Sequence, residues 1–208
     1  MAASLTRVEK ARRTRQRMLD AAARLFAEKG WTGTTVEDIA RTAEVGVQTV
    51  YFTFGSKRAL LKELVDTTVA GDSDPVATLE RPWARKVLDE PDPAAQLALQ
   101  AAGARRILER AAPILEVVRG AATADPEIAE LWQVNHEQRH AVQLHFAEAL
   151  LAKAGGALRH DYDSATAADI TMTALGPETY GLLVTRRGWT PARWEQWAAD
   201  ALVRQLLS

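Results

Sequence analysis

The sequence predicts an all-α protein, and three observations lead to this prediction. Apolar residues recur at helical spacing, as at Leu19, Ala22 and Phe26. At Asp92-Pro93, Asp125-Pro126 and Thr190-Pro191 a proline follows a residue whose polar side chain can cap a helix, and the proline suits the first turn of that helix. No stretch shows the sustained polar and apolar alternation, with hairpin turns, that is typical of β-strands. The patterns together indicate roughly nine helices.

The N-terminal elements follow from local signals. We expect the first helix to end at Gly30, because glycine is common directly after a helix end. Thr34 and Glu37 have the spacing of a capping box, which predicts a short helix over "VEDIARTA". A turn over residues 44–46 separates this helix from a second short helix that begins at Val47.

The later helices are expected to begin at Pro93, Pro126 and Pro191, the three prolines that follow a capping residue. The helix from Pro126 is expected to end at Gly155-Gly156, and another helix at Gly188. The loop-like residues 70–75 and the following segment separate a compact N-terminal part from a larger helical body.

Composition restricts the class of protein. The chain has 208 residues, of which 47% are hydrophobic and 25% charged, as in ordinary globular domains. It contains no cysteine, so disulfides and cysteine-ligated metal sites are excluded, and a cytoplasmic location is expected. The basic N-terminus has no apolar run behind it, and no apolar stretch approaches the roughly 20 residues of a membrane helix. We therefore expect no membrane association.

The net charge of −1 conceals an asymmetry between the two parts of the chain. Residues 1–62 contain 12 Lys or Arg and 6 Asp or Glu, whereas residues 63–208 contain 14 Lys or Arg and 21 Asp or Glu. A basic N-terminal third indicates contact with a polyanion at that end of the chain. A basic helix that is simply solvated fits the same charges.

Residues 35–57, "TVEDIARTAEVGVQTVYFTFGSK", have the pattern of two short helices joined by a tight turn. Ile39 and Ala40 form the predicted buried face of the first helix, and Val45 and Val50 are spaced to pack back on it. One face of the second helix then points outward. An exposed second helix of this kind fits the major groove of B-DNA, where its N-terminal residues meet base edges.

The same region resembles the DNA-binding segment of the TetR/AcrR family of transcriptional regulators. Glu44 and Gly46 depart from the family pattern, which usually has a turn glycine and a capping serine at these places. The resemblance implies a three-helix helix-turn-helix DNA-binding domain over residues 1–58 and a helical ligand-binding and dimerisation domain over residues 59–208. The matching positions are Thr35, Ile39, Ala40, Ala43, Val45, Thr49, Tyr51, Phe54, Ser56, Lys57 and Leu60.

The resemblance implies roles for single residues at a DNA interface. Gln48 is the candidate for base reading, since its amide can pair with adenine, and Val47 is the candidate for contact with a thymine methyl group. Phe52 is expected to lie against a sugar or the backbone, and the basic run over residues 10–17 to reach the backbone or a minor groove. Phosphate contacts are expected from Thr35, Tyr51 and Lys57. The predicted DNA-binding residues are Arg15, Thr35, Gly46, Val47, Gln48, Thr49, Tyr51, Phe52 and Lys57.

Regulators of this kind are homodimers, because two recognition helices must address successive major-groove faces of a palindromic double-stranded operator, about 34–36 Å apart. Stripes at helical spacing in the last two helices predict the dimer seam. The alternative is that both stripes face the core of the subunit itself. The seam residues are Leu182, Leu183, Trp194, Trp197, Ala198, Ala201, Leu202 and Gln205.

The resemblance further implies a pocket for a small-molecule effector among the helices of the body. Polar or aromatic residues within otherwise apolar helices are the candidates for its lining, although core packing or surface exposure is the alternative for each. The implied function is a ligand-responsive repressor that its effector releases from the operator, without enzymatic activity and without a cofactor. The predicted ligand-binding residues are Arg106, Trp132, Asn135, His136, Thr173 and Tyr180.

The stretch "HEQRH", residues 136–140, matches the short zinc-peptidase pattern H-E-x-x-H and supports a rival hypothesis, a zinc-dependent hydrolase. His136 and His140 would share the metal, and Glu137 would be the general base. A third ligand is missing at the positions that the extended motif requires, and Glu178, further along the chain, is the favoured substitute by position. We therefore expect no metal site. A metal analysis of the purified protein would separate the two hypotheses.

Overall fold

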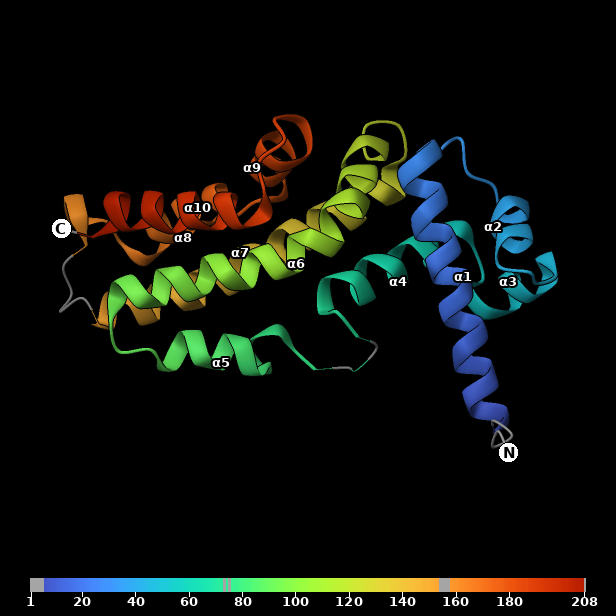
Figure 1. Ribbon diagram of the computed structural model, residues 1–208, viewed down its shortest axis with the longest axis horizontal. Helices are drawn as coiled ribbons and strands as arrows, with labels where there is room; N and C mark the ends of the chain where they lie inside the picture. Colours follow the sequence, from blue (N-terminus) through green and yellow to red (C-terminus); the bar gives the residue numbers. More distant parts are fainter. Residues whose placement is uncertain (1–5, 73, 75, 154–157, 208) are drawn as a thin grey trace. The chain divides into compact units, whose positions relative to one another are not determined.

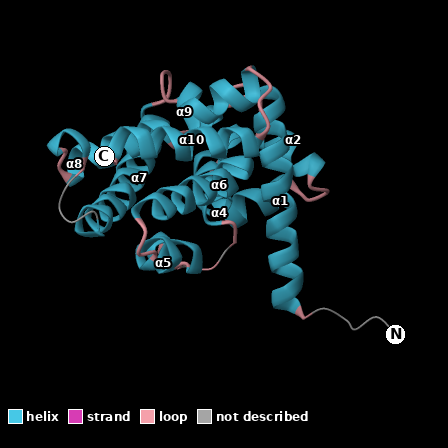
Figure 2. Cartoon of the chain, turned by 60° about the vertical axis from the view of Figure 1, so that its left-hand side comes forward, coloured by secondary structure: helices cyan, strands magenta, loops and turns pink. Residues whose placement is uncertain are grey.

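The computed structural model describes residues 6–72, 74, 76–153 and 158–207. These residues form helices and connecting loops, with no strand among them (Figure 2), which confirms the predicted all-α class. No helix within the described ranges is both long and apolar enough to span a membrane. In chain order the α-helices are α1 (Arg7–Lys29), α2 (Val36–Thr42), α3 (Val47–Phe54), α4 (Lys57–Ala70), α5 (Pro82–Asp89), α6 (Pro93–Ala121), α7 (Pro126–Lys153), α8 (Ser164–Ala174), α9 (Pro177–Tyr180) and α10 (Pro191–Leu206) (Figure 1).

The chain packs as two compact units. The first unit comprises the described part of residues 1–67 together with residues 113–132. The second unit comprises the described parts of residues 68–112 and 133–208. The long helices α6 and α7 therefore contribute to both units. The predicted division into a DNA-binding domain over residues 1–58 and a ligand-binding and dimerisation domain over residues 59–208 stays a prediction.

Helix α1 is the longest element of the first unit outside α6 and α7. A capping box fixes its start, since Thr6 Oγ1 accepts from the Glu9 amide at 3.2 Å and Glu9 Oε2 accepts from the Thr6 amide at 2.6 Å. Its buried residues begin only at Met18. Most of the half before Met18 extends beyond the helices with which α1 packs (Figures 1 and 2), although Arg15 in this half reaches Glu63 of α4. The helix ends at Gly30, as predicted, with a φ of 70°.

The predicted capping box at Thr34 and Glu37 is wrong. Thr35 caps α2, because its hydroxyl oxygen accepts from the Asp38 amide at 3.1 Å. Thr34 is fully buried, and its hydroxyl lies 3.1 Å from the Leu25 carbonyl oxygen and 2.9 Å from that of Gly30. Thr34 therefore satisfies carbonyls at the end of α1, and the cap of α2 moves one residue along the chain.

The predicted helix starts at Pro93, Pro126 and Pro191 are confirmed. The expected end at Gly155-Gly156 lies outside the described residues, and α7 is described as far as Lys153. Helix α6 continues through Pro113, which the sequence signals did not predict. The helical structure before Gly188 also differs from expectation, because residues 181–186 form a π-helix.

In the second unit, α5 packs on α6 and α7 around a cluster of Ala84, Val87 and Phe146. The Trp83 ring meets Phe146 edge-on, with 6.1 Å between ring centroids, and covers Gly103 of α6. A buried polar network accompanies this apolar contact. Gln96 is fully buried, donates to the Phe146 carbonyl at 2.9 Å and accepts from the Lys153 ammonium at 2.9 Å.

Candidate DNA interface and effector region

The turn between α2 and α3 has the geometry that the helix-turn-helix prediction requires. The Val45 amide donates to the Ala40 carbonyl at 3.0 Å, and Gly46 stands at the N-cap of α3. Glu44, at the position of the usual turn glycine, has a φ of 54°. Glu44 therefore adopts the left-handed backbone conformation although it carries a side chain, which strains the backbone. The turn keeps its geometry.

Helix α3 is packed on one side and open on the other. Val50 and Phe54, one turn apart, are buried with 2% and 8% of their surface exposed. Residues two positions apart on a helix differ by about 200° in direction, so Gln48 and Phe52 point away from the packed side. Phe52 is 94% exposed, and Tyr51 on the flank is 44% exposed. The predicted outward face of the recognition helix is therefore present.

Lys57 does not extend into solvent. Its ammonium donates to the carbonyl oxygens of Trp31 and Thr34, both at 2.9 Å, and lies 3.9 Å from the centroid of the Trp31 ring. Burial lowers the pKa of Lys57, while the charge of Asp125 partly opposes this change. In this conformation the residue joins the start of α4 to the loop between α1 and α2, and its predicted phosphate contact stays a prediction.

Arg15 is likewise engaged within the first unit. Its guanidinium pairs with Glu63 of α4 and lies 4.8 Å from the centroid of the Phe54 ring. Arg15 precedes the buried Leu19 by one turn, so it lies on the packed face of α1.

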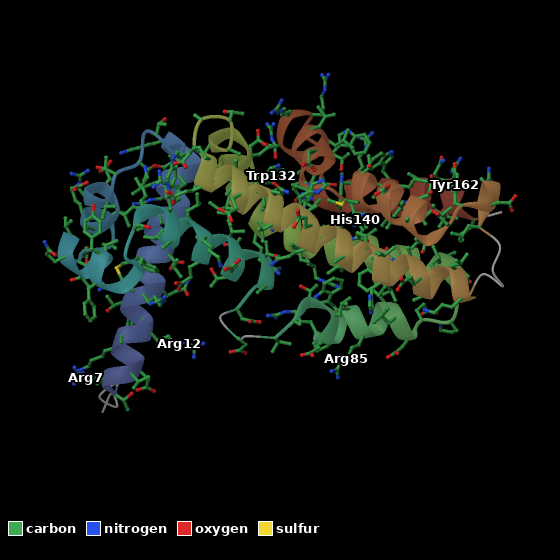
Figure 3. All side chains as sticks on the ribbon, turned by 180° about the vertical axis from the view of Figure 1, so that it is seen from behind. Arg7, Arg12, Arg85, Trp132, His140 and Tyr162 are labelled. Carbon is green, nitrogen blue, oxygen red and sulfur yellow. The ribbon has the colours of Figure 1, made fainter. Side chains whose placement is uncertain are left out.

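The other basic residues of the run behave differently from Arg15. Lys10, Arg12 and Arg13 are exposed, on the half of α1 that extends beyond its packing partners; Figure 3 shows Arg7 and Arg12 there. The run predicted to meet DNA therefore contains Arg15, which is paired with Glu63 while 44% of its side chain is exposed, and exposed cations on the first turns of α1; its contact with DNA stays a prediction.

The remaining predicted DNA contacts lie at helix starts. Thr35 is exposed at the N-cap of α2, and its hydroxyl, which accepts from a backbone amide, still has a proton to donate to an anion. Gly46 and Thr49 are exposed at the start of α3, where Val47 is half-buried. An anion in front of these helix starts would meet backbone N–H groups and the positive end of the helix dipole.

The predicted ligand-binding residues differ widely in their exposure. Asn135 and Tyr180 are buried, Trp132 is half-buried, and Arg106 and His136 are exposed. Burial raises the pKa of Tyr180, and the nearby charge of Glu109 acts in the same direction. The set as a whole stays a prediction.

The polar row on α7 to which Asn135 belongs was not predicted from the sequence. Asn135, Arg139 and Gln143 follow one another at one-turn spacing and therefore share a face of the helix, on which Phe146 and Leu150 are buried further along. Within the described residues, Asn135 Oδ1 and Gln143 Oε1 are buried without a hydrogen-bond partner. Burial also lowers the pKa of Arg139, whereas the charge of Glu178 raises it. The i, i+4, i+8 spacing was the signal that would have identified this row.

The α10 residues of the predicted dimer seam lie on two faces of that helix. Trp194, Ala198 and Leu202 are buried, and the Trp194 ring lies against Tyr180 with 5.1 Å between centroids. Trp197, 36% exposed, lies on the neighbouring face. There α10 and α8 border an open groove of about 430 Å³, called the α8–α10 groove below. Its lining residues are Asp169, Ile170, Thr173, Ala174, Thr179, Trp197, Ala201, Leu202 and Gln205.

The zinc hypothesis receives no support from the geometry of residues 136–140. His140 Nε2 lies 3.1 Å from Asp169 Oδ1 on α8, and Glu137 accepts from the Gln133 side-chain amide at 3.0 Å. His136 and Glu178 are both exposed. In the described parts of the chain, no three His, Asp or Glu side chains are grouped so that they could hold a metal ion.

A two-helix unit with an outward second helix, on a basic N-terminal part, defines a helix-turn-helix DNA-binding protein. Comparison with known proteins identifies the family of the DNA-binding segment. Residues 18–64 match the model of "Bacterial regulatory proteins, tetR family". Residues 18–64 therefore form a DNA-binding segment of the tetR family, as the motif indicated.

Individual relatives are similar to the chain in two different ways. A probable helix-turn-helix transcriptional regulator of Bacillus subtilis, YttP, is 34% identical over 65 residues, which cover 31% of each chain. NalD of Pseudomonas aeruginosa, the secondary repressor of the MexAB-OprM multidrug efflux pump, is 22% identical, with 96% of this chain and 98% of that chain covered and a TM-score of 0.72. FadR of B. subtilis, solved with stearoyl-CoA, is 17% identical, with 90% and 97% covered and a TM-score of 0.72. YttP thus matches over about a third of each chain, and the two solved structures share the fold of this chain.

Proposed function

We propose that the protein is a ligand-responsive, DNA-binding transcriptional regulator, and in particular a cytoplasmic, non-enzymatic repressor that a small-molecule effector releases from a palindromic operator. The observation that carries the proposal is the outward face of α3, with Gln48 and Phe52 directed away from the buried Val50 and Phe54. A polar amide beside an aromatic ring on an exposed helix suits the base edges of a major groove.

The charge distribution supports the same function. The exposed cations on the first half of α1 and the helix starts at Thr35 and Gly46 all belong to the first unit, which carries α3. Phosphate contacts from such groups set the register of a protein on DNA and supply sequence-independent affinity. NalD, which shares the fold, is a repressor, and this supports the sign of control that we propose.

The test is a titration of labelled duplex DNA from the chain's own upstream region, measured at several salt concentrations. We expect binding that exceeds binding to random duplex by at least about a thousandfold. Gln48→Ala should reduce the preference for the operator but leave the salt dependence unchanged, because Gln48 contributes no charge. Gln138→Ala, at an exposed glutamine of α7 in the second unit, provides the matched control. Equal affinity for the upstream region and random DNA would contradict the proposal.

The homodimer is the second part of the proposal, and the α8–α10 groove is the surface that supports it. An open, mostly apolar groove beside Trp197 and Ala201 would be closed by the same groove of a second copy, as two-fold symmetry requires. Two copies would bring two α3 helices to successive major-groove faces. Light scattering of the purified chain tests this part independently of DNA.

The effector site is the third part, and the polar row on α7 supports it. A buried polar atom without a hydrogen-bond partner destabilises the free protein. A ligand that supplies the missing hydrogen bond would explain why such an atom is present. We therefore place Asn135 and Gln143 at the effector site, with Arg139 between them. FadR, which shares the fold, was solved with a ligand bound, and this supports a ligand-binding role for the helical body.

A stability measurement combined with a ligand screen tests the effector site. Asn135→Leu and Gln143→Met remove the buried oxygens but keep the side-chain size, so each should leave the free protein as stable as before or slightly more stable. Both variants should lose the rise in melting temperature that compounds from a small-molecule library give with the wild type. The exposed Gln138→Leu is the control. Destabilised variants with unchanged ligand responses would assign the row to structure alone.

A further inference from the structure

Phe52 is conspicuous on the surface of the first unit. Its side chain is 94% exposed, the largest exposed fraction among the large hydrophobic residues of the described chain. It lies in α3, where Val50 and Phe54 are buried, so the helix has apolar residues on both its packed and its open side. Packing within the unit therefore does not explain why position 52 is a phenylalanine.

The helical geometry of α3 determines which residue lies on the same face as Phe52. Gln48 and Phe52 are four residues apart, which places them on the same face and about 6 Å apart along the helix axis. Successive base pairs are about 3.4 Å apart along B-DNA. A helix that presents Gln48 to one base pair therefore brings Phe52 to a base pair one or two steps away. Tyr51, which lies about 100° away around the helix, faces the flank instead.

The chemistry of the phenyl ring limits what it can recognise. It has no hydrogen-bond donor or acceptor for a phosphate or for the polar edge of a base. The distinctive apolar group that base pairs present in the major groove is the C5 methyl of thymine, and phenylalanine is one of the side chains that contact it. A ring packed on a sugar, as the sequence suggested, would gain a similar contact but would not depend on the base.

We propose that Phe52 is a specificity-determining residue that reads the C5 methyl of a thymine, one or two base pairs from the base that Gln48 reads. The inference rests on the proposed function, since it requires α3 to enter a major groove. It adds an apolar element to the recognition of each operator half-site, beside the polar one that Gln48 supplies.

The experiment begins with selection of preferred duplexes from a random pool by the full chain. Each thymine of the selected site is then replaced by uracil, which removes the methyl group and keeps the base pairing. One thymine position in each half-site should respond. The expected loss is about fourfold per half-site, the equivalent of one buried methyl-sized group, and about 15-fold when both half-sites carry uracil.

Variants assign the lost affinity to one side chain. Phe52→Ala should bind more weakly and should no longer distinguish thymine from uracil at the responding position. Phe52→Leu, which keeps an apolar side chain, should retain part of the discrimination, and Gln48→Ala should retain all of it. Because Phe52 is almost wholly exposed, Phe52→Ala should unfold at the wild-type urea concentration.

The outcomes separate this inference from the proposed function. A selected site whose thymines all tolerate uracil, or that contains no thymine, would overturn the role of Phe52 and leave the regulator proposal intact. The same would follow if Phe52→Ala kept the discrimination. If no sequence were selected from the pool at all, the proposed DNA-binding function itself would fail.

Discussion

The substitution Lys57→Met distinguishes a structural role of Lys57 in the first unit from a role in DNA contact. The wild-type ammonium donates two hydrogen bonds of 2.9 Å to backbone carbonyls and lies over the Trp31 ring. A hydrogen bond to a charged group contributes about 1.5–3 kcal/mol, and the cation–π contact about 0.5–1 kcal/mol. Methionine keeps most of the apolar stem but neither of these interactions.

The net loss of stability should be smaller than the sum of these contributions. Burial lowers the pKa of Lys57, which means that desolvation of the charge already opposes part of the gain. We expect the free energy of unfolding to fall by about 2 kcal/mol. With a urea dependence of about 2 kcal/mol per molar, the unfolding midpoint should fall by about 1 M.

Urea unfolding followed by tryptophan fluorescence and operator titration across salt concentrations are the two assays. Lys62→Met is the matched control on the same helix, since the exposed Lys62–Asp66 pair should contribute only about 0.3–0.5 kcal/mol. A phosphate contact by Lys57 would instead lower the slope of log affinity against log salt by about 0.9. An unchanged unfolding midpoint together with such a reduced slope would refute the structural role of Lys57.

Three further predictions concern other parts of the chain. Glu44→Gly should raise the free energy of unfolding by about 0.5–1 kcal/mol, because glycine adopts the φ of 54° without strain; a lower urea midpoint would show that the side chain contributes more than its strain costs. Trp197→Glu should convert the proposed dimer to a monomer in light scattering without a loss of helical circular dichroism, and a persistent dimer would place the interface elsewhere. Hydrogen bonds from Arg81 lower the pKa of Asp72 to about 2, so their pairing stabilises the fold fully above pH 3.8 and is lost as the pH falls through about 2. In an NMR titration, Arg81→Gln should return the pKa of Asp72 towards 3.8, and an unchanged midpoint would contradict the assignment.

The sequence predicted those features whose signals are local. Helix starts at capped prolines, the turn before Val47 and the outward face of α3 depend on residues within a few positions of one another, and all are present in the structure. The capping box at Thr34 failed because its hydroxyl is used by the end of α1, a contact that helical patterns do not encode.

The features that could not be predicted depend on partners distant in the chain. Arg15 and Glu63 are 48 residues apart, and Lys57 is 26 residues from Trp31, so local patterns did not predict these contacts; the DNA roles of both cations stay predictions. The apolar stripe of α10 was recognised, but neighbouring positions on a helix differ by about 100°, and only the fold decides which flank faces inward. The π-helix at residues 181–186 also shifts the register that was assumed for Leu182, which is 48% exposed.

The close approach of Trp83 to Gly103 has a consequence for the evolution of the chain. A β-carbon at position 103 would lie 2.7 Å from Cε3 and 2.8 Å from Cζ3 of the indole, closer than carbon atoms approach without rearrangement. The two positions should therefore vary together among homologous sequences. Where a tryptophan occupies position 83 we expect glycine at 103, and where 103 carries a larger residue we expect a smaller side chain at 83.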